Sequence, residues 1–245
     1  MNLNLCQIRV AGYTPAMSSS MPESTATTPS GYGGTDRDSA SRRRLPTQAR
    51  SRERVERVLD ATSELVVAGG IDGISTRSIA ARAQLPVASL YQYFSDKEAV
   101  LLAICERDMA EMDDQVATDL AALDELTIGS LVETSMRAFV KVYHRRPAFM
   151  QIWMRGRTNA AVYEYGRRHN RRIAADLLAV ATDAGLVDAG DFTTGELASV
   201  AELAVELGDR AFQLAFEHDA RGDAFLIDQA IELVAGYLDR IANPA

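Results

Sequence analysis

The chain has 245 residues, of which 47% are hydrophobic, and a formal net charge of −8 at pH 7. This length fits one large domain or two small ones, and the composition is that of a globular protein. No apolar run reaches the roughly 18 to 20 residues that a membrane-spanning helix needs, and the first residues lack a secretory signal pattern. Two cysteines, Cys6 and Cys105, form no disulfide framework and no C-x-x-C pair, so a reduced, cytoplasmic environment is expected.

The charge is distributed unevenly along the chain. Residues 41–100 carry ten Lys and Arg against seven Asp and Glu, whereas residues 101–245 carry fourteen against twenty-four. A mildly basic segment is therefore joined to a strongly acidic remainder, which favours contact of the basic part with a polyanion.

Residues 1–48 are predicted to be a disordered arm. Ser, Thr, Gly and Pro crowd residues 14–41, and no hydrophobic periodicity is present. Arg42-Arg43-Arg44 near the end of this arm is either a solvated charge cluster or an arm that touches nucleic acid.

Three helices are predicted next. Apolar residues at helical spacing indicate the first over Ser51–Ala68, and Gly69-Gly70 ends it. Ser75 is a suitable N-cap for the second, which runs to about Ala83. The third spans about Val87–Phe94 and turns one apolar side toward the core.

The remainder of the chain also has the pattern of helices, without strands or repeats. Ser95 followed three residues later by Glu98 matches a capping box, which opens a fourth helix that runs to about Ala122. Five further helices are predicted over residues 128–144, 148–155, 160–184, 194–219 and 223–242.

Two sequence runs in the basic segment have a specific pattern. Thr76-Arg77-Ser78-Ile79-Ala80 is followed by a run from Leu90 to Leu101 that reads L-Y-x-Y-F-x-x-K-E-x-[LV]-L. With these runs, the sequence resembles the tetracycline-repressor-like (TetR/AcrR) family of transcriptional regulators over about Val58–Leu102.

The resemblance implies an all-α fold in which residues 49–96 form a helix-turn-helix DNA-binding domain. Residues 97–245 would form a helical domain for effector binding and dimerisation. The implied function is that of a sequence-specific transcriptional regulator, typically a repressor that a small molecule releases from a palindromic operator. This function involves no catalysis, no cofactor and no metal.

The DNA-binding candidates follow from the two helices of the motif. A hydroxyl and backbone N–H groups at the start of the second helix suit a phosphate oxygen, and an arginine there suits a guanine edge. A cation in the first turn of a helix, as at Lys97, is explained by a nearby anion such as phosphate. The competing explanations are ion pairs of Arg77 with Asp72 and of Lys97 with its acidic neighbours, and tyrosine hydroxyls that merely face water. The candidates are Ser75, Thr76, Arg77, Val87, Ala88, Ser89, Tyr91, Gln92, Tyr93 and Lys97.

The turn between these helices departs from the family pattern Ala-Gly-Val-Ser. The chain has Ala83-Gln84-Leu85-Pro86 instead. The missing glycine predicts a left-handed conformation for Gln84, and Pro86 leaves the third helix without a side-chain cap. Operator preference is therefore not transferable from the family.

Aromatic and sulfur-containing residues cluster between residues 136 and 165, where they are candidates either for an apolar ligand pocket or for plain core packing. The same region is basic, and most of its arginines are expected on the solvated helix surface, while one or two are candidates for contact with an anionic ligand; they are Arg155, Arg157, Arg167, Arg168, Arg171 and Arg172. His169, on the same Arg-rich helix, is expected at the surface. The apolar candidates are Met136, Phe139, Tyr143, Phe149, Trp153 and Tyr163.

The last two predicted helices carry long apolar stripes, from Leu197 to Phe216 and from Phe225 to Leu238. The resemblance implies that they form a four-helix bundle with a second copy of the chain, which would give a two-fold homodimer. Two alternatives remain at this point, an all-helical enzyme and a helical scaffold that does not bind DNA. The three scattered histidines show no metal-type or catalytic spacing, which weakens the enzyme hypothesis.

Overall fold

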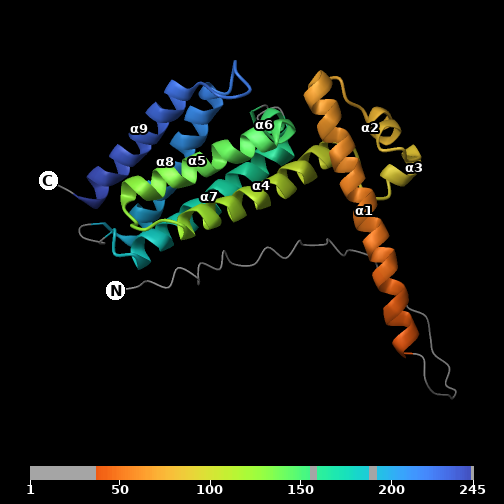
Figure 1. Ribbon diagram of the computed structural model, residues 1–245, viewed down its shortest axis with the longest axis horizontal. Coiled ribbons are helices and arrows are strands. Elements are labelled where there is room, and N and C mark those ends of the chain that lie inside the picture. Colours follow the sequence, from red (N-terminus) through yellow and green to blue (C-terminus); the bar gives the residue numbers. More distant parts are fainter. Residues whose placement is uncertain (1–36, 155–158, 188–191, 244–245) are drawn as a thin grey trace.

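The computed structural model describes residues 37–154, 159–187 and 192–243, with side chains from Ala49 onward. Within these ranges the chain forms nine helices and no strand, which confirms the predicted all-α class. Figure 1 shows α2 and α3 on one side of the long helix α1, and the later helices on the other side.

The N-terminal unit, here called the head, consists of α1 (Arg37–Gly69), α2 (Thr76–Arg82) and α3 (Val87–Leu90). Helix α1 begins at Arg37, so the prediction of disorder up to residue 48 is wrong for its last twelve residues, while residues 1–36 lie outside the described part. The prediction relied on the lack of hydrophobic periodicity, and that lack does not exclude a helix. The three helices share a core in which the largest buried side chains are Val58, Val66, Ile79 and Leu90.

The start of α2 is formed as predicted. The Ser75 hydroxyl accepts a hydrogen bond from the Ser78 backbone N–H at 3.1 Å, and the Ser78 hydroxyl accepts one from the Ser75 N–H at 2.9 Å. The turn after α2 places Gln84 at φ 56°, so the predicted left-handed conformation is confirmed. The Leu85 N–H then donates to the Ala80 carbonyl at 2.9 Å, which closes the turn.

Helix α3 is shorter than predicted. It has four residues, starts at Val87 after Pro86, which provides no side-chain cap, as expected, and ends at Leu90 rather than Phe94. Beyond it the Gln92 N–H donates to the Ser89 carbonyl and the Tyr93 N–H to the Leu90 carbonyl, which are the i to i−3 bonds of a tighter turn. Leu90 and Phe94 are nonetheless buried, as the spacing predicted.

The remaining helices form the body of the molecule. Helix α8 packs on α9 and α7, and α5 packs on α4 and α9, so the body is a layered bundle. Helix α8 ends at Ala215, four residues before the predicted end, and the other boundaries lie within two residues of the prediction. The helices are α4 (Lys97–Ala121), α5 (Ile128–Arg145), α6 (Pro147–Met154), α7 (Ala160–Asp183), α8 (Thr194–Ala215) and α9 (Ala224–Ala242).

The N-cap of α4 differs from the predicted one. Asp96, not Ser95, caps the helix, and its Oδ1 accepts a hydrogen bond from the Ala99 N–H at 2.8 Å. Aspartate is as good an N-cap as serine, and its charge also suits the positive end of the helix dipole. Glu98 therefore stands one position too early for a capping box, and Lys97 becomes the first residue of the helix.

Head and body meet where α1 packs against α4 and α6. The Arg107 guanidinium of α4 lies 3.2 Å from Glu56 Oε2 and 2.9 Å from Asp60 Oδ1, both on α1. Its Nε also donates to Oδ1 of Asp108, which is 1% exposed. Ion pairs with α1 therefore tie one turn of α4 to the head. None of the described helices is long and apolar enough to cross a membrane.

Candidate nucleic-acid interface and body pocket

One pair of polar side chains joins the two helices of the predicted motif. The hydroxyls of Thr76, at the start of α2, and of Tyr91, just after α3, lie 3.1 Å apart. Tyr91 is 52% exposed, although tyrosine usually buries most of its ring. The fold thus brings together two candidates that are fifteen residues apart in the sequence and leaves their hydroxyls accessible.

The other candidates for base contacts lie at or near the surface of the same two segments. Arg77, Ala88 and Gln92 are exposed, and Ser89 is half-buried. Val87 is also half-buried, but it packs against the core of the head and so has a structural role as well. Ser75 is exposed and acts as the cap already described.

Tyr93 has a different environment from Tyr91. It is half-buried, and hydrogen bonds with the side chains of Ser51 and then Arg54, both on α1, lower the pKa of its hydroxyl. The alternation of the two tyrosines in the sequence predicted that they cannot share one side. It did not predict that α1 supplies partners for the second, because contacts between distant segments leave no local signal.

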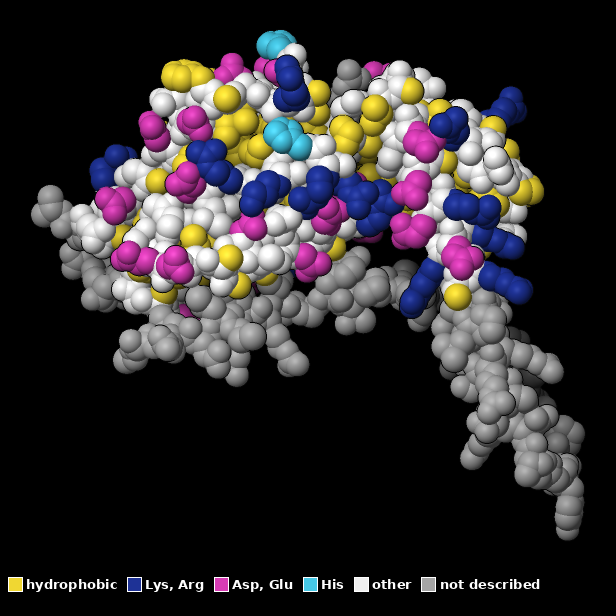
Figure 2. Space-filling model, in the orientation of Figure 1, with side chains coloured by type: hydrophobic (Ala, Val, Ile, Leu, Met, Phe, Trp, Pro, Cys, Tyr) yellow, Lys and Arg dark blue, Asp and Glu magenta, His cyan; other side chains and the backbone are white. Residues whose placement is uncertain are grey.

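Basic side chains gather around the described part of α1, at the right of Figure 2. The exposed arginines of this part of α1 are Arg50, Arg52, Arg54 and Arg57. Lys97 is half-buried at the first position of α4. Over the body, positive and negative side chains alternate instead (Figure 2).

Most of the predicted apolar ligand residues form part of the hydrophobic core. The rings of Tyr143 and Phe149 are 5.8 Å apart and those of Tyr143 and Phe216 are 5.3 Å apart, at angles typical of packed aromatic pairs. Met136, Tyr143, Phe149 and Trp153 are buried and Phe139 is half-buried, whereas Tyr163 is 47% exposed. Core packing, the alternative weighed from the sequence, accounts for all of these positions except Tyr163.

Trp153 fixes α6 against α7 and α8. Its indole N–H donates to Asp209 Oδ1 at 2.8 Å. Its ring lies directly on Gly166, where an added Cβ would stand 2.5 Å from Cη2. A glycine is required at this position because the ring occupies the space of a side chain.

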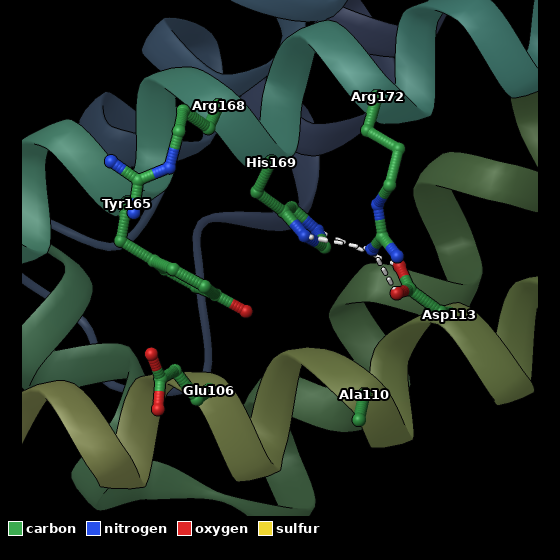
Figure 3. A pocket seen from close by; sticks show the side chains of 7 residues that line it. All are labelled: Glu106, Ala110, Asp113, Tyr165, Arg168, His169 and Arg172. Atoms are coloured by element: carbon green, nitrogen blue, oxygen red, sulfur yellow. Dashed lines mark hydrogen bonds and ion pairs between the residues drawn. The ribbon is translucent and has the colours of Figure 1, made fainter. Parts of the chain in front are cut away.

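A pocket of about 250 Å³ opens between α4 and α7 (Figure 3). The lining residues recur at helical spacing on each helix, so one stripe of α4 faces one stripe of α7. Helix α4 contributes Glu106, Ala110 and Asp113, and α7 contributes Tyr165, Arg168, His169 and Arg172.

His169 is 4% exposed, so the expectation of a surface position is wrong. Burial, together with the smaller effect of the nearby charge of Arg172, lowers the pKa of the imidazole to about 3. Its Nδ1 lies 3.1 Å from Nη2 of Arg172, which also pairs with Asp113 across the pocket. The buried residues Val162, Gly166, His169 and Ile173 recur at steps of three and four, and this stripe was the signal in the sequence.

The two carboxyl groups of the pocket differ in their partners. Burial raises the pKa of Asp113, and Arg172 opposes the shift. Burial also raises the pKa of Glu106, against the weaker effect of Arg168. Among the described residues, none forms a hydrogen bond or an ion pair with the Glu106 carboxylate.

The Arg-rich stretch of α7 divides into two sets. Arg167 and Arg171 pair with glutamates of α8, and Arg168 and Arg172 line the pocket. The other two arginines considered from the sequence, Arg155 and Arg157, lie outside the described residues.

Large apolar side chains are exposed on α8 and α9. Most of the predicted apolar stripe packs inside the subunit, where Leu197, Phe216, Ile227 and Val234 are buried. The exposed set is therefore largely a different one, here called the outer apolar set: Leu203, Leu214, Phe225, Leu226 and Leu233.

Comparisons with known proteins agree with this organisation. The family model described as "Bacterial regulatory proteins, tetR family" matches residues 58–104, from α1 into α4. The HTH-type transcriptional repressor KstR of Mycolicibacterium smegmatis is 39% identical over 72 residues, which are 29% of this chain and 34% of that repressor. KstR of Rhodococcus jostii is 37% identical over 62 residues, or 25% and 29% of the two chains. The matched segment thus spans about a third of these curated relatives.

Solved structures extend the likeness to the body. A TetR-family transcriptional regulator from Streptomyces coelicolor aligns with a TM-score of 0.62 and 27% identity, over 77% of this chain and 99% of that one. A putative TetR-family regulator from Syntrophomonas wolfei aligns with a TM-score of 0.59 over 78% and 96%, and at 16% identity it supports the fold alone. The head of this chain thus matches the model of the tetR family of bacterial regulatory proteins, and its helical architecture is similar to that of TetR-family regulators.

Proposed function

We propose that this protein is a homodimeric transcriptional repressor that binds a palindromic DNA operator through its head and leaves the operator when a small molecule binds the body. The curated relatives are named as repressors, and the matching family model of regulatory proteins covers residues 58–104, most of which lie in the head. The likeness to a family of regulators also argues against the enzyme and scaffold alternatives. A chromosomal target implies a cytoplasmic location, and the function requires neither a cofactor nor a metal.

The observation that carries the proposal is the exposed hydroxyl pair of Thr76 and Tyr91. Two hydroxyls 3.1 Å apart on a surface stabilise the fold little, since water can replace either partner. They can instead hold one phosphate oxygen and so fix the position of α3 on the duplex. Arg77 and Gln92, which directly follow Thr76 and Tyr91 in the sequence, are exposed. They would then read guanine and adenine edges in the major groove.

The outer apolar set supports dimerisation. Phe225 is 69% exposed and Leu233 is 56% exposed, on a helix whose opposite side is buried in the subunit. A second copy of α8 and α9 would cover these side chains by a two-fold contact. Two heads would then stand about 34 Å apart, one turn of DNA, which requires a palindromic site.

The proposed functions of the two regions follow the boundary between head and body. Residues 49–96 would bind DNA and residues 97–245 would dimerise and bind the effector. Because Arg107 of α4 is tied to α1 through Glu56 and Asp60, a shift of α4 would reorient the head. The ligand would thus favour a spacing of the two heads that no longer fits both half-sites.

The salt dependence of DNA binding tests this function. A duplex selected from genomic fragments should bind the wild-type protein, and the affinity should fall steeply as salt rises, since bound phosphates release counterions. Lys97→Ala should weaken binding to all sequences alike and reduce the slope of log affinity against log salt by about 1. Lys141→Ala, the same substitution at an exposed site on α5, should change neither quantity.

Two outcomes would contradict the proposal. The first is a salt response that is flat for the wild-type protein. The second is a loss of sequence discrimination, rather than of overall affinity, in Lys97→Ala, which would mean that this residue reads bases.

A further inference from the structure

The pocket between α4 and α7 holds polar groups whose hydrogen-bonding capacity is unused. His169 Nδ1 faces a guanidinium, which only donates, so Nδ1 accepts and the neutral ring carries its proton on Nε2. This Nε2 is buried without a hydrogen-bond partner, since the nearest carboxylate oxygen, Asp113 Oδ1, is 3.6 Å away. A buried donor without an acceptor costs stability, so the fold does not gain from this arrangement.

Glu106, at one end of the pocket, is a hydrogen-bond acceptor that lacks a donor. Its carboxylate is half-buried and makes no hydrogen bond or ion pair with any residue in the described part of the chain. Figure 3 shows Glu106 and Arg168 at one end of the pocket and the Asp113–Arg172 pair at the other, with His169 and the Tyr165 ring between them. A ligand that fits must bring a donor to Glu106 and an acceptor to His169.

The charges decide between a cationic and an anionic ligand. Arg172 is already bound to Asp113 and His169, so Arg168 is the guanidinium left for an anion. Arg168 is exposed, and water screens its charge, whereas the half-buried Glu106 acts in a medium of lower dielectric. A cation therefore gains more at Glu106 than an anion gains at Arg168.

The pocket also has a flat wall. The rings of Tyr165 and His169 stack with centroids 6.0 Å apart and an interplanar angle of 23°. An aromatic face next to a carboxylate suits an ammonium group, which is attracted to both. The volume of about 250 Å³ lies below the usual range of roughly 300 to 1,000 Å³ for drug-sized ligands, so the ligand is small.

We propose that the effector of this regulator is a small amine, whose ammonium group binds Glu106 and Tyr165 and whose hydrogen-bond acceptor meets the imidazole N–H of His169. This inference rests on the proposed function, since it names the ligand class of that regulator. Glu106 directly precedes Arg107, which holds α1. An amine that draws in Glu106 would therefore move the residue that ties α4 to the head.

The test uses three molecules that share one phenol ring and differ in one group. Tyramine carries an ammonium, tyrosol a hydroxyl and 4-hydroxyphenylacetate a carboxylate, and histamine adds a second amine with a different ring. Calorimetry and thermal denaturation of the full-length protein without DNA should show binding of the amines at millimolar concentration or tighter, and no binding of the acid.

Three variants assign the binding to the pocket. Glu106→Gln should weaken tyramine binding by about tenfold or more, since it removes the charged acceptor. Arg168→Gln should strengthen it a few-fold, since it removes a competing cation. Glu164→Gln, a matched change at an exposed position of α7, should have no effect. Glu106→Gln without ligand should melt no lower than the wild-type protein, because the carboxylate that it removes is desolvated.

The outcomes separate this inference from the function on which it rests. Absence of amine binding, or binding of the acid that Arg168→Gln abolishes, would overturn the amine assignment even if the protein binds its operator. Tyramine should also weaken operator binding by the wild-type protein but not by Glu106→Gln. Amine binding that leaves operator affinity unchanged would overturn its role as effector, whereas a protein that binds no DNA without amine would contradict the proposed function itself.

Discussion

The head and the body use polar side chains in opposite ways. In the head, Thr76, Arg77 and Tyr91 stand at the surface, and the first and third of these meet each other there. In the body, Asp108, Asp113 and His169 lie inside, between helices, and their partners are arginines from the same or a neighbouring helix. The head leaves these polar groups accessible at its surface, whereas the body encloses them.

The difference shows which part of the molecule depends on another molecule. An exposed polar pair costs no free energy without a ligand, because water satisfies it, so the head folds without the partner proposed for it. A buried donor such as His169 Nε2 costs free energy in every copy of the protein without ligand. A ligand that accepts a hydrogen bond from His169 would therefore stabilise the body by removing this cost in free energy. The exposed pair of the head carries no such cost.

The largest expected effect comes from substitutions in the body that should weaken DNA binding by the head. Phe225→Glu combined with Leu233→Glu should give a folded monomer, because both side chains are exposed in the subunit and charges there oppose pairing. Operator affinity should fall by about 10²- to 10⁴-fold, since the second half-site contact is no longer intramolecular. Sedimentation and DNA titration measure the two effects, and Thr182→Glu, at an exposed position of α7, serves as the control. A double variant that remains a dimer would place the interface elsewhere.

A smaller effect sharpens the role of the head. Arg77→Ala should reduce discrimination between the operator and single-base variants by about 1 to 3 kcal/mol, or roughly 5- to 150-fold. Arg82→Ala on the same helix should leave discrimination unchanged, because Arg82 Nε is bound to Glu64 at 2.6 Å. If the two variants behave alike, Arg77 is a structural partner, as in the ion pair with Asp72 considered from the sequence.

Acid should act on the body through His169. Its pKa is lowered to about 3 in the folded protein, so below pH 6.5 the unfolded chain binds a proton that the folded protein does not. Stability should therefore fall by about 2 kcal/mol from pH 7 to pH 5 through this group. Glu106, Asp108 and Asp113 act in the opposite direction, because their raised pKa values make the folded protein bind protons more readily.

The His169→Gln variant separates these contributions. It retains an acceptor for Arg172 but has no group that titrates in this range. Urea unfolding at a fixed protein concentration should show that the variant loses about 2 kcal/mol less than the wild-type protein between pH 7 and pH 5. If the free energy of unfolding changes equally with pH in the two proteins, His169 must be protonated in the folded state.

The same contrast explains how far the sequence could predict the structure. In the head, caps, turns and short runs of residues decide the local conformation, so the Ser75 cap and the left-handed Gln84 were both predicted. In the body the helices were predicted well, but not which of their faces meet. Leu214 and Leu197 belong to one apolar stripe in the sequence, yet the first is exposed and the second is buried.

The pocket was missed for a related reason. Its lining comes from two helices about sixty residues apart in the chain, and no local pattern aligns Glu106 with Arg168. The aromatic cluster that was considered instead is prominent in the sequence because large apolar side chains also build cores. His169 was misplaced because its arginine neighbours dominate the composition of α7, while the buried stripe of small and apolar residues that contains it is less conspicuous.

The smallest effect concerns the turn of the head. Gln84 has φ 56°, a conformation that costs a residue with a Cβ about 1 to 2 kcal/mol, and glycine adopts it without this cost. Glycine also gains more freedom on unfolding, so Gln84→Gly should stabilise the protein by only about 0.5 to 1 kcal/mol. Ala81→Gly, three residues earlier in α2 and equally exposed, should destabilise it by about 1 kcal/mol.

If Gln84→Gly raises the free energy of unfolding and Ala81→Gly lowers it, then backbone conformation, and not the lost side chain, decides the effect of a glycine. DNA affinity should be unchanged in Gln84→Gly, because the Leu85 N–H still donates to the Ala80 carbonyl and holds α3 in place. Thermal denaturation and DNA titration measure both quantities. If Gln84→Gly is destabilising, the glutamine side chain must stabilise the turn by more than its backbone strain costs, and the head would then depend on a side chain at a position where the family pattern has a glycine.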